Sequence, residues 1–385
     1  MTDVITKNRL FVASCMALTT TSMTFAIRAK LEGVFMSDYG LTSEEIGLAF
    51  GPAFWGFTLA MMIGGPLVDY FGMKKIINLA MLGHLSGIVL TLFAHDFWTL
   101  FTGTMLIGIG NGMVEAACNP LVATLFPDEK TKMLNRFHIW FPLGIVIGSV
   151  LGYVLVDMMG LSWMVLVGTL FIPLLGYVFL FFGKQLPQTE RVSLGVSNVD
   201  MLKACVSPLF IFLVLCMMLT ATTELGTGQR IDSLLSKSGV APLLILAFVN
   251  GIMVVGRFFA GDIVKKLSIT KMLMFSAIFS CIGLIWLSYA SGMMTFAAAG
   301  VFAVGVCYFW PTMLSFVADK VPESGALGLS IMGGVGMFSV SVVLWLMGLF
   351  MDTNGSGADT LRIMAILPAI LIVAFGALHF SKKAA

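Results

Sequence analysis

The feature that most constrains this chain is a succession of long apolar stretches that follow one another along the sequence. Hydrophobic residues make up 58% of the 385 positions and charged residues only 11%, whereas a soluble domain has about 25% charged residues. Because a helix needs about 20 apolar residues to cross a bilayer, each stretch is long enough to span a membrane. The stretches cover about residues 10–34, 46–71, 75–94, 98–126, 136–157, 162–183, 207–235, 241–264, 271–290, 295–317, 327–351 and 361–380. The sequence therefore predicts an all-α membrane protein with twelve transmembrane helices.

One polar segment interrupts this succession near the middle of the chain. Residues 184–206 separate the first six apolar stretches from the last six and contain the chain's longest polar run, residues 184–203. We interpret this segment as a cytoplasmic linker. It would join an N-terminal six-helix bundle, residues 1–183, to a C-terminal six-helix bundle, residues 207–385.

The two predicted halves share features at corresponding places. Asp69 stands near the end of the second stretch and Asp262 near the end of the eighth, each shortly before a pair of lysines. Pro120 in the fourth stretch likewise corresponds to Pro311 in the tenth. Halves that repeat about an axis normal to the membrane are a transporter architecture. The repeat therefore predicts two pseudo-symmetric bundles.

Lysine and arginine residues are unevenly distributed between alternate loops. If the N-terminus is cytoplasmic, that side receives most of them, and the opposite loops receive little beyond Lys237 and Arg362. This asymmetry follows the positive-inside rule, so we expect both termini in the cytoplasm and a bacterial-type inner (plasma) membrane location. The first apolar stretch is longer than the apolar region of a signal peptide and lacks a small-residue cleavage site, so we expect no cleavable signal.

The loop after the second stretch carries a recognisable pattern, G-x-L-x-D-x-x-G-x-K-K, from Gly65 to Lys75. It resembles the signature loop of the major facilitator superfamily. Residues 108–144 are similar to the corresponding run of the fucose–proton symporter family. In that family, one helix carries a Glu followed by small residues and Asn-Pro, and the next helix begins with Leu-Asn. The resemblance implies the major facilitator fold and sugar–proton symport, and it implicates Glu115 in proton coupling. Where that family has a functional Asp in its first helix, this chain has Ala29.

Three ionisable residues in the predicted membrane region are candidates for proton coupling. Glu115 lies near the middle of the fourth stretch, Glu224 near the middle of the seventh, and His138 near the start of the fifth. Such groups are costly in a bilayer unless they face a cavity or a partner, and histidine can titrate near neutral pH. The alternatives are a structural Glu paired permanently with an Arg, and a His that serves only as a structural hydrogen bonder.

The candidate substrate-binding residues are polar or aromatic side chains expected in the membrane region of both halves: Arg28, Glu115, Asn119, Trp140, Glu224, Gln229, Arg230 and Trp310. Arg28 would either contact substrate or pair with Glu115. Gly226 and Gly228 weaken the seventh helix, as expected where a transporter helix breaks to line its site.

Other charged residues have different expected roles. Lys30 and Glu32 approach the outer interface in the first stretch, where long charged side chains can snorkel. A second group lies at the predicted cytoplasmic helix ends, where charge networks between helices could hold one state shut: Asp69, Lys74, Arg257 and Asp262. The alternative for this group is a role in topology and helix-end electrostatics alone.

These features lead to a preferred function and two alternatives. We expect proton-coupled symport of a monosaccharide or similar small polar metabolite by alternating access. The first alternative is an organic-anion or phosphorylated-metabolite exchanger or exporter in which Arg28 and Arg230 clamp the anion. The remote alternative is a membrane receptor that does not transport.

The sequence also bears on cofactors, partners and catalysis. It has no HExxH, GxSxG or P-loop motif and no Cys/His ligand cluster, so we expect neither an enzyme nor a metal site. We expect no cofactor, with a proton or else sodium as the coupling ion. The net charge of +2 does not indicate nucleic acid. The expected partners are a small polar solute, with a sugar as the first expectation, and the lipid bilayer, and a monomer suffices for this mechanism.

Overall fold

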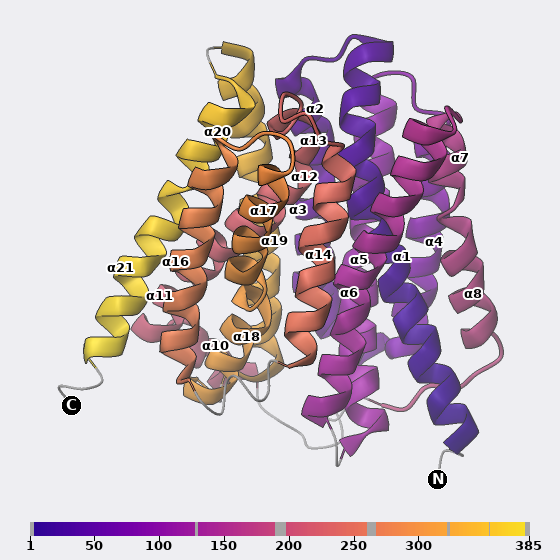
Figure 1. The fold of residues 1–385 in the computed structure, drawn as a ribbon. Helices are drawn as coiled ribbons and strands as arrows, with labels where there is room; N and C mark the ends of the chain where they lie inside the picture. The colour runs from indigo at the N-terminus through magenta and orange to yellow at the C-terminus, as the bar shows by residue number, and fades with distance from the viewer. Residues whose placement is uncertain are drawn as a thin grey trace.

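The computed structural model describes residues 4–127, 130–188, 198–259, 267–321, 324–353 and 355–381, and Figure 1 shows a bundle of long, roughly parallel helices. The first half of the chain forms α1 (Val4–Tyr39), α2 (Ser43–Phe50), α3 (Pro52–Phe71), α4 (Met73–Leu92), α5 (Phe97–Leu125), α6 (Lys130–Gly152), the π-helical η2 (Tyr153–Met158), α7 (Trp163–Gly168) and α8 (Phe171–Phe181).

The second half forms α10 (Asn198–Cys205), α11 (Pro208–Ala221), the π-helical η3 (Thr222–Gly226), α12 (Thr227–Gln229), α13 (Ile231–Leu234), α14 (Pro242–Phe258), α16 (Ile269–Leu287), α17 (Met294–Val306), α18 (Phe309–Lys320), α19 (Gly325–Thr353), α20 (Gly357–Met364) and α21 (Ile366–Ser381). Both termini lie at the same end of the bundle (Figure 1).

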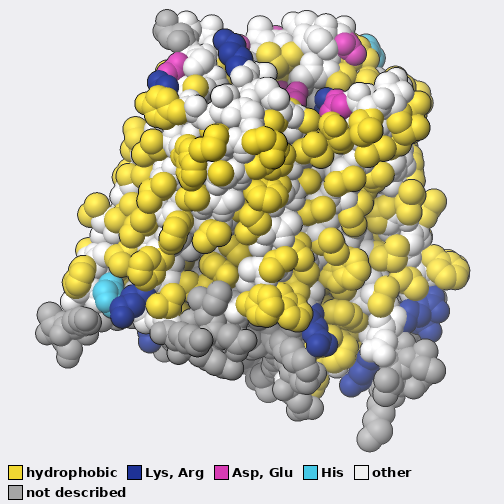
Figure 2. All heavy atoms as spheres, in the orientation of Figure 1, with side chains coloured by type: hydrophobic (Ala, Val, Ile, Leu, Met, Phe, Trp, Pro, Cys, Tyr) yellow, Lys and Arg dark blue, Asp and Glu magenta, His cyan; other side chains and the backbone are white. Residues whose placement is uncertain are grey.

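The helices confirm the predicted membrane protein. Within the described ranges, 11 helical segments are long and apolar enough to cross a membrane, and the shorter apolar helix Pro242–Phe258 stands where a further span was predicted. Apolar side chains cover the visible face of the molecule, and most of its visible Lys and Arg residues lie toward the end that carries the termini (Figure 2). A chain with this surface requires lipid around its middle.

Several spans are broken rather than continuous, because Gly and Pro interrupt their backbone. The second span divides into α2 and α3 at Gly51-Pro52, and the tenth divides into α17 and α18 just before Pro311. A proline removes the hydrogen bond to the carbonyl four residues earlier. The breaks place free backbone groups inside the bundle, where side chains from other helices can bind them.

The interior consists of two large clusters of buried apolar side chains, one mainly in each half. Between the halves, α14 packs against α6, and α19 packs against α2 and α3. Within the first half, α3 and α5 are in close contact because glycines face the neighbouring backbone. A Cβ at Gly108 would lie 2.5 Å from the Ala53 carbonyl oxygen, and one at Gly112 would lie 2.5 Å from that of Phe57.

A buried hydrogen-bond chain joins four helices of the first half, and sequence reasoning missed it. Tyr177 lies 2.9 Å from Nδ1 of His84, and Nε2 of His84 lies 2.8 Å from Oδ1 of Asn111. Asn111 then donates to the Thr24 hydroxyl at 3.1 Å. Because the amide oxygen can only accept, His84 donates from Nε2, and in the neutral imidazole Nδ1 is then the acceptor for the Tyr177 hydroxyl. The neutral imidazole therefore satisfies every bond in the chain.

Replacing Asn111 with Leu tests the energetic role of this chain. The variant leaves the Nε2–H of fully buried His84 without its acceptor, and an unsatisfied buried donor costs about 1–3 kcal/mol. We expect a lower thermal midpoint for the Asn111→Leu protein in detergent than for the unaltered protein. Ser86→Ala on the exposed side of α4 removes only local hydroxyl bonds to the Leu82 and Gly83 carbonyls and is the matched control. An unchanged midpoint in Asn111→Leu would contradict the prediction.

Candidate functional site

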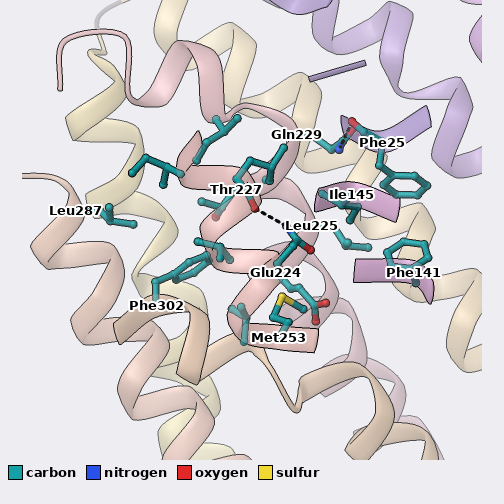
Figure 3. Close-up of a pocket in the computed structure, with 17 residues that line it drawn as sticks. Phe25, Phe141, Ile145, Glu224, Leu225, Thr227, Gln229, Met253, Leu287 and Phe302 are labelled. Carbon is teal, nitrogen blue, oxygen red and sulfur yellow. Dashed lines mark hydrogen bonds between the residues drawn. The ribbon is translucent and has the colours of Figure 1, made fainter. Parts of the chain in front are cut away.

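Two cavities lie where the halves meet, and three residues line both: Phe141, Glu224 and Leu225. The first, which we call the apolar cavity, extends between α14, α16 and α17 and is shown in Figure 3. The second, the polar cavity, is also lined by Glu115, His138, Arg257, Trp310 and Met337. The polar cavity brings together all three residues predicted to couple protons, two from the first half and one from the second.

Glu224 reaches the cavities because its helix is irregular. The seventh span changes from α-helix to a π-helical turn over Thr222–Gly226 and ends at Gln229, before a short separate helix. Such π-helical turns are frequent at functional sites. The predicted weakening of this helix around its glycines is confirmed. Figure 3 shows Glu224, Thr227 and Gln229 on this segment, with Phe25 and Phe141 on one side and Phe302 on the other.

Glu224 forms an ion pair with Arg257, at 3.1 Å between Oε1 and Nη2, and both side chains are at least nine-tenths buried. Arg257 also donates from Nε to the Cys307 carbonyl at 3.0 Å. That carbonyl is free because its helical partner would be the backbone N–H of residue 311, which is a proline. The break in the tenth span therefore orients Arg257 toward the polar cavity.

Arg257, predicted to belong to a cytoplasmic gate, lies in the last turn of α14, but its side chain is turned toward Glu224. Helix α14 ends at Phe258, and Arg257 lines the polar cavity. Of the other predicted gate residues, Asp262 and the side chain of Asp69 lie outside the described residues, and Lys74 is exposed. The gate itself stays a prediction.

Across the polar cavity, Glu115 is held by neutral groups. Asn119, one helical turn further along α5, donates to Glu115 at 2.7 Å, and Nε2 of His138 lies 3.1 Å from the Asn119 amide oxygen. No ion pair to Glu115 occurs among the described residues. The site thus holds one carboxyl with a cationic partner, Glu224, and one with an amide partner, Glu115.

Arg28 joins the two halves near the apolar cavity without an acidic partner. Its Nε donates to the Gln229 amide oxygen at 2.8 Å, and Gln229 in turn donates to the Phe25 carbonyl at 3.0 Å. The guanidinium lies 4.8 Å and 4.9 Å from the ring centroids of Phe25 and Phe54. The structure therefore shows contact with Gln229 in place of the alternative pair with Glu115.

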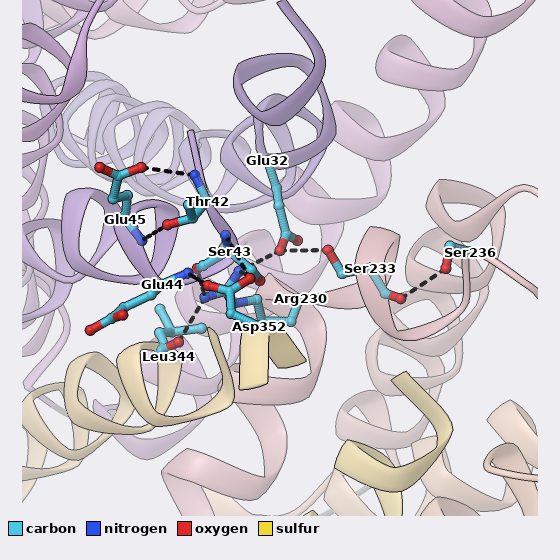
Figure 4. Close-up of polar contacts among 10 residues, drawn as sticks. All are labelled: Glu32, Thr42, Ser43, Glu44, Glu45, Arg230, Ser233, Ser236, Leu344 and Asp352. Atoms are coloured by element: carbon cyan, nitrogen blue, oxygen red, sulfur yellow. Dashed lines mark hydrogen bonds and ion pairs between the residues drawn. The ribbon is translucent and has the colours of Figure 1, made fainter. Parts of the chain in front are cut away.

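Arg230 connects α12 to α13 at the end of the bundle opposite the termini (Figure 1), and Figure 4 shows its contacts there. It forms an ion pair with Glu32 at 2.6 Å, and Ser233 donates to the same carboxylate oxygen at 2.7 Å. It also donates to the Ser43 carbonyl at 2.7 Å and the Leu344 carbonyl at 2.8 Å. We call this cluster of Glu32, Ser43, Arg230, Ser233 and Leu344 the latch.

The latch corrects two sequence interpretations. Glu32 does not snorkel to the interface, because it is completely buried against Arg230. Arg230 lines neither cavity among the described residues, and both of its terminal nitrogens donate within the latch, so this conformation does not support an anion clamp made of Arg28 and Arg230. Lys30, also expected to snorkel, forms an ion pair with Asp157 at 2.6 Å.

Two further contacts near the latch join α19 to α2, and no sequence signal pointed to either. Asp352 accepts from the backbone N–H of Glu44 at 2.6 Å and of Ser43 at 3.2 Å, at the N-terminus of α2. An acidic group is favourable there because the first N–H groups of a helix have no partners within it. Trp345 donates to Glu44 at 3.0 Å. These contacts hold the two halves together at this end.

The two predicted tryptophans have different positions. Trp310 lines the polar cavity, where its predicted contact with substrate stays a prediction. Trp140 is 37% exposed on the outer surface and lines neither cavity, whereas its neighbour Phe141 lines both. The predicted aromatic residue, Trp140, is therefore in the correct turn of α6, but the cavities are lined by the next residue, Phe141.

Comparisons with solved structures identify the fold. The D-xylose-proton symporter is 15% identical, with a TM-score of 0.77 over 97% of each chain. A variant of the E. coli fucose:proton symporter FucP is 15% identical, with a TM-score of 0.69 over 97% of this chain and 98% of that one. The nucleoside transporter NupG is 12% identical, with a TM-score of 0.74 over 97% and 99%. At such identities the likeness concerns the fold.

Curated relatives match shorter parts of the chain. The multidrug resistance protein MdtH of Shigella dysenteriae is 27% identical over 31% of this chain and 29% of its own length. A probable chloroplastic anion transporter 3 of Oryza sativa is 26% identical over 32% and 24%. The matched region is therefore less than a third of each relative. The family model of the Major Facilitator Superfamily matches residues 10–343, and the chain therefore belongs to the Major Facilitator Superfamily of membrane transporters.

Proposed function

We propose that this protein is a proton-coupled secondary transporter that moves a small organic solute by alternating access, with Glu115 as the proton site. One observation carries the proposal. Glu115 and Glu224 come from opposite halves and line the same cavity, but only Glu224 has a cationic partner in the described structure. A carboxylate without such a partner is costly inside a membrane, and taking up a proton removes its charge.

The proposed cycle follows from these contacts. With the latch closed, Glu115 exchanges its proton with the side of the membrane to which the polar cavity opens. When the halves rock and the latch separates, the same carboxyl faces the other side. His138 and Asn119 hold Glu115 in place, since His138 donates to Asn119 and Asn119 donates to Glu115. On the opposite side of the polar cavity, the ion pair between Glu224 and Arg257 carries no net charge.

The monosaccharide expected from the sequence stays a prediction. The similarity in fold to a D-xylose-proton symporter and a fucose:proton symporter favours it. Trp310 in the polar cavity favours it as well, because an aromatic face can stack on a sugar ring. The orientation with both termini in the cytoplasm is also a proposal, which rests on the distribution of Lys and Arg.

Reconstitution into liposomes that contain a pH-sensitive dye tests the proposal. With an inward proton gradient, addition of a transported solute should acidify the interior faster than in liposomes without protein, and a protonophore should abolish solute accumulation. L-fucose, D-xylose and short monocarboxylates are the first solutes to apply. Accumulation that depends on sodium, or that continues after the proton gradient has collapsed, would overturn the proposed coupling.

A further inference from the structure

Arg28 is a buried cation for which the described protein supplies no anion. Its side chain is only 4% exposed, and none of the ion pairs in the described ranges includes it. Arginine stays protonated in proteins, and an isolated buried charge is costly unless it is paired. Glu32, one turn further along α1, is committed to Arg230 and Ser233.

The contacts of Arg28 leave one of its donor groups without an acceptor. Nε is occupied by a neutral amide oxygen, that of Gln229, while Nη2 is buried with no hydrogen-bond partner. The rings of Phe25 and Phe54 stabilise the cation through their faces but accept no conventional hydrogen bond. A guanidinium binds a carboxylate through two parallel N–H groups, so Gln229 occupies the place that one carboxylate oxygen would take.

The adjoining apolar cavity indicates the chemical character of the rest of the ligand. Phe25 and Gln229 line it, together with apolar side chains such as Leu246, Val249 and Phe302. Its polar side chains each have a partner within the protein, although Oε2 of Glu224 is buried without one. Asn250 donates to the Leu246 carbonyl at 2.9 Å, and Thr227 donates to the Thr223 carbonyl at 2.9 Å. A body covered with hydroxyl groups would find few partners there, whereas an apolar body would be accommodated.

We propose that Arg28 binds the carboxylate of a small organic monoanion whose apolar body occupies the apolar cavity. Gln229 covers the guanidinium in the closed state and withdraws when the anion arrives. This replaces a clamp of two arginines with a single site, because Arg230 belongs to the latch. The biological meaning of the site rests on the proposed transport function, since one proton on Glu115 would accompany one monoanion and make the cycle electroneutral.

Ligand binding to the purified full chain in detergent tests the site without any proton gradient. The probes are benzoate and hexanoate, each compared with its neutral amide, benzamide and hexanamide. We expect at least one carboxylate to raise the thermal midpoint in a saturable manner, with its amide giving a much smaller shift. L-fucose serves as the polyhydroxylated comparison. If neither carboxylate exceeds its amide, or if only L-fucose stabilises the protein, the proposal is overturned.

Gln229→Glu is the decisive variant because it supplies the missing anion from the protein itself. The new carboxylate should pair with Arg28, raise the thermal midpoint of the ligand-free protein and weaken carboxylate binding at least about tenfold, equivalent to about 1.4 kcal/mol. Gln229→Met, of similar size but neutral, should keep the preference for carboxylate over amide. Arg28→Met should lose that preference while folding at least as well, because a buried unpaired charge has been removed.

These variants separate a binding site from general damage. A Gln229→Glu protein that binds the carboxylate as tightly as the unaltered protein would overturn the proposal, and so would an Arg28→Met protein that keeps the preference. Because binding is measured at fixed pH in detergent, it is independent of coupling at Glu115. Carboxylate binding without proton movement in liposomes would therefore refute only the proposed coupling, and proton-coupled uptake of a neutral solute would refute only the anion site.

Discussion

Glu115→Gln should abolish solute accumulation driven by a proton gradient while leaving counterflow of the same solute largely intact. The amide keeps the size of the side chain and its contact with Asn119 but cannot bind and release a proton. Loss of gradient-driven uptake without loss of exchange is the signature of a coupling residue, because exchange needs only the loaded carrier to reorient. The measurement compares net uptake and counterflow in the same proteoliposomes.

Glu45→Gln is the matched control for this experiment. Glu45 belongs to the capping box that begins α2, accepting from the backbone N–H of Thr42 at 2.8 Å on the exposed surface, so its neutralisation should leave both activities unchanged. Concentrative uptake at the normal level in Glu115→Gln would rule out Glu115 as the proton site. Loss of counterflow as well would mean that Glu115 is needed for solute binding or reorientation rather than for coupling alone.

Arg230→Met should shift the protein strongly toward a state that is open at the end opposite the termini. The change leaves Glu32 completely buried and without its cation. Breaking a buried ion pair in this way costs about 3–5 kcal/mol, which corresponds to a shift in the closed-to-open equilibrium of roughly a hundredfold or more. Opening relieves this cost because Glu32 can then be solvated.

The reactivity of an introduced cysteine measures that shift. Leu246→Cys lines the apolar cavity, and in a background without the native cysteines an impermeant maleimide should label it faster when Arg230→Met is present. Lys30→Met is the matched control, because the Lys30–Asp157 pair lies within the first half and is partly exposed. Equal labelling rates with and without Arg230→Met would show that the latch does not control access.

Exchanging the charges of Glu32 and Arg230 separates the contribution of the ion pair to closure from the contribution of the local geometry. Glu32→Arg combined with Arg230→Glu keeps both charges at the contact, and we expect slower labelling than in either single variant. A double variant that labels as fast as Arg230→Met would indicate that the fixed geometry around the Ser43 and Leu344 carbonyls, rather than the ion pair, closes this end.

Much of the architecture was predictable because it depends on local sequence. Span length and apolarity are properties of contiguous residues, so the transmembrane segments and the break in the seventh helix follow from the order of apolar residues, Gly and Pro. The depth of Glu115 and Glu224 in their stretches is likewise local, and it sufficed to predict that both face the interior. His84 was missed because a single histidine inside an apolar stretch gives no sign of the Asn111 and Tyr177 partners on other helices.

What the sequence by itself determined is which segments cross the membrane and which ionisable groups lie within it. Only the tertiary structure decided the partner of each charge: Gln229 for Arg28, Glu32 for Arg230, and Glu224 for Arg257. The physical reason is that the partner in a hydrogen bond or ion pair must lie within about 3 Å. Whether two groups come that close depends on which helices are adjacent and on which breaks in the backbone leave a carbonyl free. Cys307 and Pro311, which carry no charge, thereby determined that the Arg257 side chain faces the polar cavity.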